Sequence, residues 1–313
     1  MGVDRPTERK GRLNPMTRSF LLAAAASLAL LGVSAADTAS PAAAPAVLAS
    51  IKAGAPTRMV FELDAKAMVF ILPVSGRASF TVDMKPEAYA IKSRVRTTGL
   101  ADIFVNYDMH LTAEGKTTAS GLKTTKYVSQ NKDGKKDRRV EVDITDKGFK
   151  MTANPRFGNL GDPAATAEQV LQTNDPLTAL ITFALEPRAK GADACGGPIK
   201  VFDGRQLTYL HLKRGKSGMV KQKTPAWSGD TIECHVTMDK IAGYKKGEVN
   251  KDTLTGIDGP LRMYLAPLEN GSYVPVKIVA DTDKIGKVTL QARTLRFEPL
   301  VTASTGTSSG GGR

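Results

Sequence analysis

The sequence is poor in residues that bind metals or perform nucleophilic chemistry, because its 313 residues include only two cysteines and three histidines. The histidines, His110, His211 and His235, are dispersed along the chain. A Gly-x-Ser-x-Gly nucleophile motif, a phosphate-binding glycine loop and a His-Glu-x-x-His zinc motif are all absent. We therefore nominate no catalytic residue, metal ligand or cofactor, and we expect a non-enzymatic protein.

Acidic residues form no catalytic pattern either. Asp102, Asp108 and Glu114 offer carboxylates for the hydrolysis of a glycan, but no spacing fixes two of them at a catalytic separation. An exported hydrolase therefore ranks last among the functional hypotheses.

The sequence also lacks an apolar run long enough to cross a membrane comfortably. Its longest run, 20–33, has 14 residues, whereas a spanning helix needs about 20. The run follows a basic residue, Arg18, and ends near small residues at Val33 and Ala35, as in a cleaved signal peptide. We expect 1–35 to be a signal peptide cleaved after Ala35, or after Ala36, and a periplasmic protein without a transmembrane segment. A short membrane anchor is the alternative.

Two further stretches lack the periodic apolar residues of a folded element. Residues 36–56 are rich in alanine and proline, and 301–313 form a polar tail of low complexity. The intervening 57–300 are long enough to bury a core, and β domains of this size often remain single. We expect a linker over 36–56, one β-rich domain over 57–300 and a disordered tail.

Alternation of apolar and polar residues is the main signal within this domain. In 89–97 one parity is apolar or small, and the other parity carries Lys92, Arg94 and Arg96. Such alternation predicts a strand with one buried and one wet face. A turn at 131–134 predicts a hairpin over 123–144.

The number of such segments predicts an all-β, mainly antiparallel fold, either a curved sheet or an open β-barrel with one packed α-helix. In the last segment the apolar parity changes between Ala292 and Leu295, which predicts a β-bulge near Arg293 or Thr294. The other expected strands are 58–63, 78–84, 206–213, 232–238, 261–266, 274–280 and 287–297.

One segment has the pattern of a helix. Asp175 is a good N-cap, Pro176 suits the first helical position, and Pro187 ends the apolar stripe of 177–184. We expect this helix to pack on or inside the sheet. A weaker helix is predicted over 163–171, capped by Asp162.

The two cysteines, Cys195 and Cys234, favour a disulfide, because an exported chain with an even cysteine count is normally oxidised. One alternative is a zinc site that adds His211 and His235. It is disfavoured because adjacent residues of a strand point to opposite faces. The other alternative is a nucleophilic Cys234 with a histidine base, which requires a free thiolate.

Between the cysteines, Asp203 and Gly204 predict a tight turn. We expect a local ion pair between Asp203 and Arg205 there, rather than a binding pair.

The formal net charge is +13. Because charges of both signs are interspersed, most of this excess is expected on a solvated surface. The alternative is contact with an anionic envelope component, through the stripe Lys92, Arg94 and Arg96. A second basic cluster would join this stripe if the strands adjoin. Nucleic acid is excluded as a partner by the expected location. The second cluster comprises Lys132, Lys135, Lys136, Arg138 and Arg139.

Four short motifs, in this order and spacing, make the chain resemble the exported bacterial family known as domain of unknown function 3108 (DUF3108). The resemblance covers roughly 57–298 and implies a periplasmic, mostly antiparallel β domain without an established activity. The motifs are Thr98-Gly99-Leu100, Asp175-Pro176-Leu177-Thr178-Ala179-Leu180, Val201-Phe202-Asp203-Gly204-Arg205, and Pro275-Val276-Lys277-Ile278 with a later Gly286.

These observations favour a non-enzymatic periplasmic protein that binds a lipid-like or envelope-derived ligand on a concave apolar surface. The second hypothesis is a structural or interaction protein that contacts anionic glycans or lipid headgroups. The oligomeric state does not follow from the sequence.

Overall fold

The computed structural model describes residues 55–69, 72–99, 107–119, 121–132, 137–247, 257–282 and 286–300. They all belong to one compact unit, Ala43–Arg313. The expected signal peptide and tail, and nearly all of the linker, lie outside the described residues.

The described residues form one sheet of 13 strands in which every neighbouring pair is antiparallel, with two short helices. The predicted fold class is therefore confirmed. The spatial order is β7-β6-β5-β4-β3-β2-β1-β13-β12-β11-β10-β9-β8. In chain order the elements are β1 Thr57–Val69, β2 Leu72–Met84, β3 Ala88–Thr98, β4 Asp108–Thr118, β5 Gly121–Asn131, β6 Arg139–Thr145, β7 Gly148–Asn154, α3 Ala167–Leu171, α4 Pro176–Leu185, β8 Ile199–Phe202, β9 Leu207–Thr224, β10 Trp227–Ala242, β11 Ile257–Pro267, β12 Tyr273–Thr282 and β13 Gly286–Pro299.

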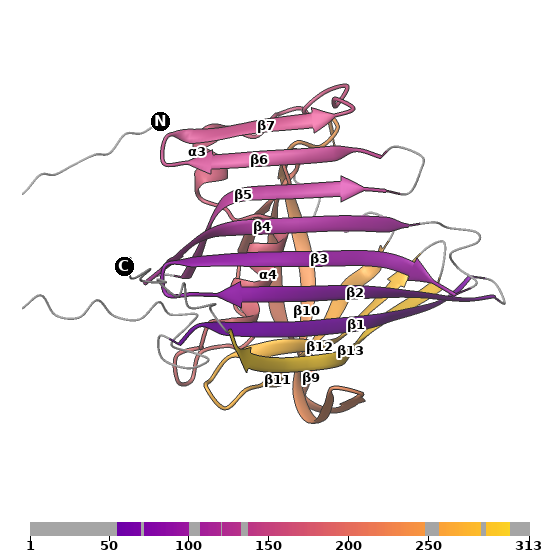
Figure 1. Ribbon diagram of the computed structural model, residues 1–313. Coiled ribbons are helices and arrows are strands. Elements are labelled where there is room, and N and C mark those ends of the chain that lie inside the picture. Colours follow the sequence, from indigo (N-terminus) through magenta and orange to yellow (C-terminus); the bar gives the residue numbers. More distant parts are fainter. Residues whose placement is uncertain are drawn as a thin grey trace, which may run out of the picture. The chain divides into compact units, whose positions relative to one another are not determined.

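The sheet curls around α4. Figure 1 shows β1 to β7 as one layer, with β10 crossing behind it and α4 between the two. Helix α4 contacts β3, β4 and β5 on one side and β8 and β12 on the other. We call the sheet face that turns toward α4 the inner face, because the main hydrophobic core lies there.

The edge strands β7 and β8 approach each other without forming a ladder, so the sheet is curved but not closed. A contact between side chains spans the two edges: the rings of Phe149 on β7 and Phe202 on β8 meet edge to face, with centroids 5.2 Å apart. Asn174 forms a bridge to Val201, and its side chain donates to the Leu122 carbonyl oxygen at 3.1 Å. The ring contact joins the two edge strands, and Asn174 links β8 to β5.

Helix α4 has the boundaries and N-cap that the sequence predicts. Asp175 Oδ1 accepts hydrogen bonds from the backbone N–H groups of Leu177 and Thr178, at 2.9 and 3.1 Å. Its other oxygen accepts the hydroxyl of Thr124 on β5 at 2.7 Å. Near the same end, the hydroxyls of Tyr89 and Thr178 lie 2.8 Å apart. Buried polar contacts thus fix the position of the helix on the inner face.

The second predicted helix was wrong in its start and cap. Helix α3 covers only Ala167–Leu171, and its N-cap is Thr166 in a capping box with Gln169. The N–H of Asp162 donates to Tyr244, and the Pro163 carbonyl accepts from Gly243. These bonds hold the preceding segment in a non-helical path.

The predicted bulge in the last strand is confirmed. Glu62 pairs with Thr294 and Leu63 pairs with Ala292, so Arg293 is the extra residue. The bulge restores the inner-face parity on both sides, since Ala292 is buried and Leu295 packs against the core.

Strands β4, β7 and β8 were not predicted as separate elements. The inner parity of β4 is mixed, because Leu111 and Ala113 are followed by Gly115 and Thr117. Such a strand lacks the apolar alternation that a sequence pattern detects.

Replacing Asp175 by alanine removes two cap bonds and leaves the buried Thr124 hydroxyl without its carboxylate acceptor. We expect a loss of about 2–3 kcal/mol in the free energy of unfolding, measured by urea denaturation. The matched control is Thr166→Ala, which removes the exposed cap of α3 and should cost about 1 kcal/mol or less. Equal losses in the two variants would contradict an anchoring role for Asp175.

Candidate functional site

Along the inner face of β1 the side chains change from large to small. Phe61 and Leu63 are large and buried, and the next positions of the same parity are Ala65 and Ala67. Because residues of one parity line one face of a strand, all four point to the inner face. The core is therefore thinner toward the end of β1.

The neighbouring strand β2 shows the same change in the matching register. Phe80 is opposite Phe61, Ala78 is opposite Leu63, and Gly76 is opposite Ala65. A Cβ atom on Gly76 would lie only 3.0 Å from the Arg96 carbonyl oxygen of β3, so a larger residue fits poorly there. Small residues on both strands leave space at this end of the sheet.

This space is a pocket of about 360 Å³, which we call the apolar pocket. Its wall is almost wholly hydrocarbon, and it has no buried polar centre. The inner-face side chains that line it are Ala65, Ala67, Val74, Ala78, Val95, Thr97, Tyr107, Val288 and Leu290.

A second pocket, of about 720 Å³, lies at the same end of the sheet, and we call it the outer pocket. The two pockets share Lys66, Ala67, Val74 and Ser75. Lys66 and Lys287 line the outer pocket, and so does Met68, whose side chain is 52% exposed. Lys66, Met68 and Lys287 have the parity that points to the outer face, so the outer pocket lies mainly on the other side of the sheet from the apolar pocket.

A third pocket, of about 430 Å³, lies on the inner face of β4, β5 and β6. We call it the arginine pocket because Arg138 and Arg205 both line it. The guanidinium carbons of Arg138 and Arg205 lie 4.6 and 5.5 Å from the centroid of the Phe157 ring. The other lining residues are Met109, Leu111, Tyr127, Ser129, Asn131, Val140, Pro176, Asp203 and Gln206.

The apolar pocket and the arginine pocket adjoin each other. Val95 lines the apolar pocket, Met109 lines the arginine pocket, and these residues are direct cross-strand partners of β3 and β4. Directly opposed side chains on one face of an antiparallel pair are in contact range. The inner face therefore carries an apolar pocket and a cationic pocket side by side.

The turn at Asp203 forms as predicted, but the expected ion pair with Arg205 is wrong. Asp203 Oδ1 accepts the backbone N–H groups of Arg205 and Gln206, at 2.9 and 2.7 Å. The Arg205 side chain instead donates to Asn159 Oδ1 at 3.0 Å. Burial raises the pKa of Asp203 above its ordinary value. The turn brings Arg205 to the arginine pocket. Gly204, with φ of +99°, lets the backbone of the turn pack against Val140.

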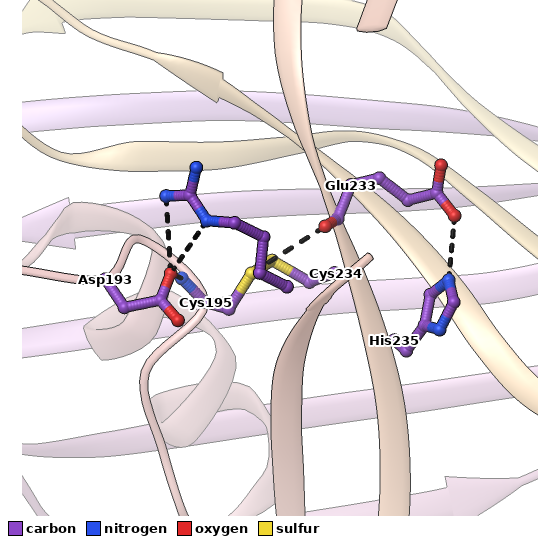
Figure 2. Close-up of a disulfide and its surroundings, with 6 residues drawn as sticks. Asp193, Cys195, Glu233, Cys234 and His235 are labelled. Carbon is purple, nitrogen blue, oxygen red and sulfur yellow. Dashed lines mark hydrogen bonds and ion pairs between the residues drawn. A yellow bond between two sulfur atoms is a disulfide. The ribbon is translucent and has the colours of Figure 1, made fainter. Parts of the chain in front are cut away.

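Cys195 and Cys234 are joined, with their sulfur atoms 2.01 Å apart, in agreement with the favoured interpretation. Figure 2 shows this bond between a loop and β10, with Asp193 and Glu233 close by. The bond sits in a second, smaller core, where both cysteines are fully buried. It fastens the loop after α4 to the sheet.

The three histidines each face a carboxylate of a nearby strand position, and they do not gather around the cysteines. His211 lies 2.8 Å from Asp239, and His235 lies 2.8 Å from Glu233, as Figure 2 shows for the latter pair. Within the part of the chain that the structure describes, no three potential metal ligands converge. The zinc alternative therefore has no support there.

The carboxylates weighed for glycan hydrolysis are not brought together. Asp108 and Glu114 both lie on β4, six positions apart, a separation of about 20 Å along a strand. Asp102 lies outside the described residues.

The stripe Lys92, Arg94 and Arg96 lies on the outer face of β3 and is exposed. Arg94 is engaged there, since Nε and Nη2 donate to the two carboxylate oxygens of Asp108, each at 2.8 Å. His110 Nε2 lies 3.2 Å from the same carboxylate. Further ion pairs on the outer face include Arg58 with Asp83 and Arg77 with Asp64. In the second basic cluster, Lys135 and Lys136 lie outside the described residues.

The apolar pocket and the arginine pocket were not predicted from the sequence. The alternation that predicted β1 continues past Leu63 through Ala65 and Ala67, and this shift to small residues is a detectable sign of unfilled space. The arginine pocket had no local sign, because Arg138, Phe157 and Arg205 come from separate loops.

Neither of the two described helices is long and apolar enough to cross a membrane.

Comparison with known proteins places these features in a family context. The model of a family described as "Protein of unknown function (DUF3108)" matches residues 60–293. No curated protein matches the sequence. A beta-barrel-like protein of domain of unknown function DUF1849 from Brucella abortus aligns at 11% identity, over 79% of this chain and 98% of that one, with a TM-score of 0.43. A DUF1329 family protein from Desulfovibrio piger aligns at 10% identity over 82% and 90% of the two chains, with a TM-score of 0.31.

The ion pair of Arg94 generates a pH prediction. Mainly because Arg94 donates to it, the pKa of Asp108 is lowered to about 2 from 3.8. A lowered carboxyl pKa in the folded state stabilises the protein above the unfolded pKa, and this contribution is lost as pH falls through the folded pKa. Arg94 is 45% exposed, so we expect Asp108→Asn to cost about 0.5–1 kcal/mol at pH 7. The cost should shrink toward zero as the pH falls from 4 to 2.

Urea denaturation of the wild type and the variant across this pH range measures the difference. Asp230→Asn is the matched control, since Asp230 is exposed and forms no ion pair with another described residue. A pH-independent cost for Asp108→Asn would rule out the ion pair as its source.

Proposed function

This chain belongs to the DUF3108 family of proteins of unknown function, and we propose that it binds a lipid-like molecule on the inner face of its curved sheet. The observation that carries this proposal is the apolar pocket of about 360 Å³ at the end where the core side chains become small. Small-molecule sites in proteins commonly have volumes of about 300–1,000 Å³. The proposed role is binding, without a chemical step.

The hydrocarbon wall of the apolar pocket favours one class of ligand. A molecule that needs hydrogen bonds would lose its bonds to water in the apolar pocket and regain almost none. An apolar chain loses nothing comparable there, and its transfer from water contributes about 25 cal/mol per Å² of buried surface. A hydrocarbon chain is therefore the favoured occupant.

The charge near this pocket bears on the ligand it would take. Lys66 lines both the apolar pocket and the outer pocket, and Lys287 and the exposed Met68 also line the outer pocket. The positive charge at this end of the sheet favours ligands or surfaces with negative charge.

The proposed place of action is the periplasm. The support is the apolar run 20–33 with small residues before the expected cleavage position. The fully buried disulfide is compatible with that compartment, since disulfides persist in oxidising environments.

Ala65→Leu tests the binding proposal, because the larger side chain would occupy the apolar pocket opposite Gly76. We expect the affinity for Nile red, a neutral apolar dye, to fall about tenfold or more, a change worth about 1.4 kcal/mol per decade. Fluorescence titration measures it. The stability should be unchanged or slightly raised, since the new side chain fills space.

Ala90→Leu is the matched control. Ala90 lies on the outer face of β3, so the same increase in side-chain size is made away from the pocket. It should bind the dye like the wild type. Dye binding that is absent in the wild type, or equal in all three proteins, would overturn the proposed site.

Expression of the full chain in a Gram-negative host tests the location. Intact mass measurement of the periplasmic fraction, after thiol alkylation without reductant, should find a protein that begins at Ala36 and carries no alkyl group. A chain that retains residues 1–35, or one with two alkylated thiols, would contradict the proposal.

A further inference from the structure

Two guanidinium groups lie over one aromatic ring in the arginine pocket of the inner face. Arg138 and Arg205 come from different segments, yet both stack on Phe157, at 4.6 and 5.5 Å from its centroid. Stacking holds a guanidinium in one plane, which leaves its edges available for hydrogen bonds. Both arginines line the arginine pocket of about 430 Å³.

The protein uses only part of the donor capacity of these groups. Arg138 donates through Nε to the Pro155 carbonyl at 2.9 Å and through Nη2 to the Arg156 carbonyl at 3.4 Å. Arg205 donates through Nη2 to Asn159 at 3.0 Å. Arg205 Nε is buried and has no acceptor among the described residues. Since each guanidinium has five N–H donors, several remain for a ligand.

The charge of the arginine pocket is positive on balance. Asp203 is the one acidic residue among the described residues that line it, against two arginines. Its Oδ1 is already held by two backbone N–H groups of the turn. An acceptor-rich anion therefore has better partners in this pocket than a neutral group has.

We infer that the arginine pocket receives the anionic head of an amphipathic ligand whose hydrocarbon chain lies in the adjoining apolar pocket. The inference rests on the proposed function and adds to it the class of head group, a carboxylate or a phosphate. Both groups present paired oxygens that match the fork of a guanidinium, and such charge-assisted bonds are stronger than neutral ones.

The arrangement of the strands fits one ligand across both pockets. The direct partners Val95 and Met109 lie where the two pockets adjoin. Neighbouring strands lie about 4.8 Å apart, so the four steps from β1 to β5 cover about 19 Å. A long single chain is needed to fill the apolar pocket while its head contacts the arginines.

Displacement of Nile red by three ligands of equal chain length tests the inference on the full mature protein. The ligands are palmitic acid, hexadecyl phosphate and hexadecanol, each below the concentration at which it self-associates. We expect one or both anions to bind about tenfold or more tighter than the neutral alcohol. The better of the two anions identifies the head group.

Arg205→Gln and Arg138→Gln should each bring the affinity for the anions close to that for hexadecanol, and leave hexadecanol binding unchanged. Retained binding of the alcohol shows that the variant is folded. Arg139→Gln is the matched control, because Arg139 is the exposed neighbour on the opposite face of β6 and pairs with Glu141 at 2.6 Å. It should keep the wild-type preference.

The outcomes separate this inference from the proposed function. If all three ligands bind the wild type equally, or if Arg205→Gln and Arg138→Gln keep the preference for anions, the inference is overturned while the binding function stands. If none of the three ligands displaces the dye and the dye itself fails to bind, the proposed function fails first.

Discussion

The arrangement depends on how the inner face of a strongly curved sheet is filled. Helix α4 fills the middle, fixed by the buried carboxylate of Asp175 and the hydroxyl contact between Tyr89 and Thr178. A ten-residue helix covers only part of a 13-stranded sheet. The remaining inner surface must be packed by its own side chains or left as a pocket, since protein interiors otherwise reach close packing.

The chain uses both solutions along the same strands. Near Phe61 and Phe80, whose ring centroids are 5.9 Å apart, large side chains close the core. A few positions further on, Ala65 and Gly76 leave it open. A pocket forgoes the packing that would stabilise a filled core, and while the Arg96 carbonyl restricts the size of the residue at Gly76, no such restriction accounts for the small side chains of Ala65 and Ala67. The proposed function follows from that contrast.

Charge is distributed differently on the two faces. On the outer face, several basic residues have acidic partners on the same or an adjacent strand, as in Arg58 with Asp83 and Arg94 with Asp108. In the arginine pocket the two cations instead stack on Phe157 and bond to carbonyl and amide oxygens. Oxygen acceptors of this kind carry no formal charge, and Asp203 is the one acidic residue among the described residues that line this pocket. Guanidinium groups in excess over carboxylates, with spare donors, are suited to an anion, whereas paired charges on a solvated face contribute mainly solubility.

The sequence by itself determined the all-β class, helix α4 with its Asp175 cap, the bulge at Arg293 and the turn at Asp203, because each depends on contacts or periodicities within a few residues. It did not reveal β4, whose inner parity is mixed, or the start of α3, where bonds from Gly243 and to Tyr244 prevail over local preference. Only the tertiary structure decided that Arg138, Phe157 and Arg205 share a pocket and that this pocket adjoins the apolar pocket at Val95. Their proximity arises from the curvature of the sheet, which brings strands distant in the chain together and leaves no local trace in the sequence.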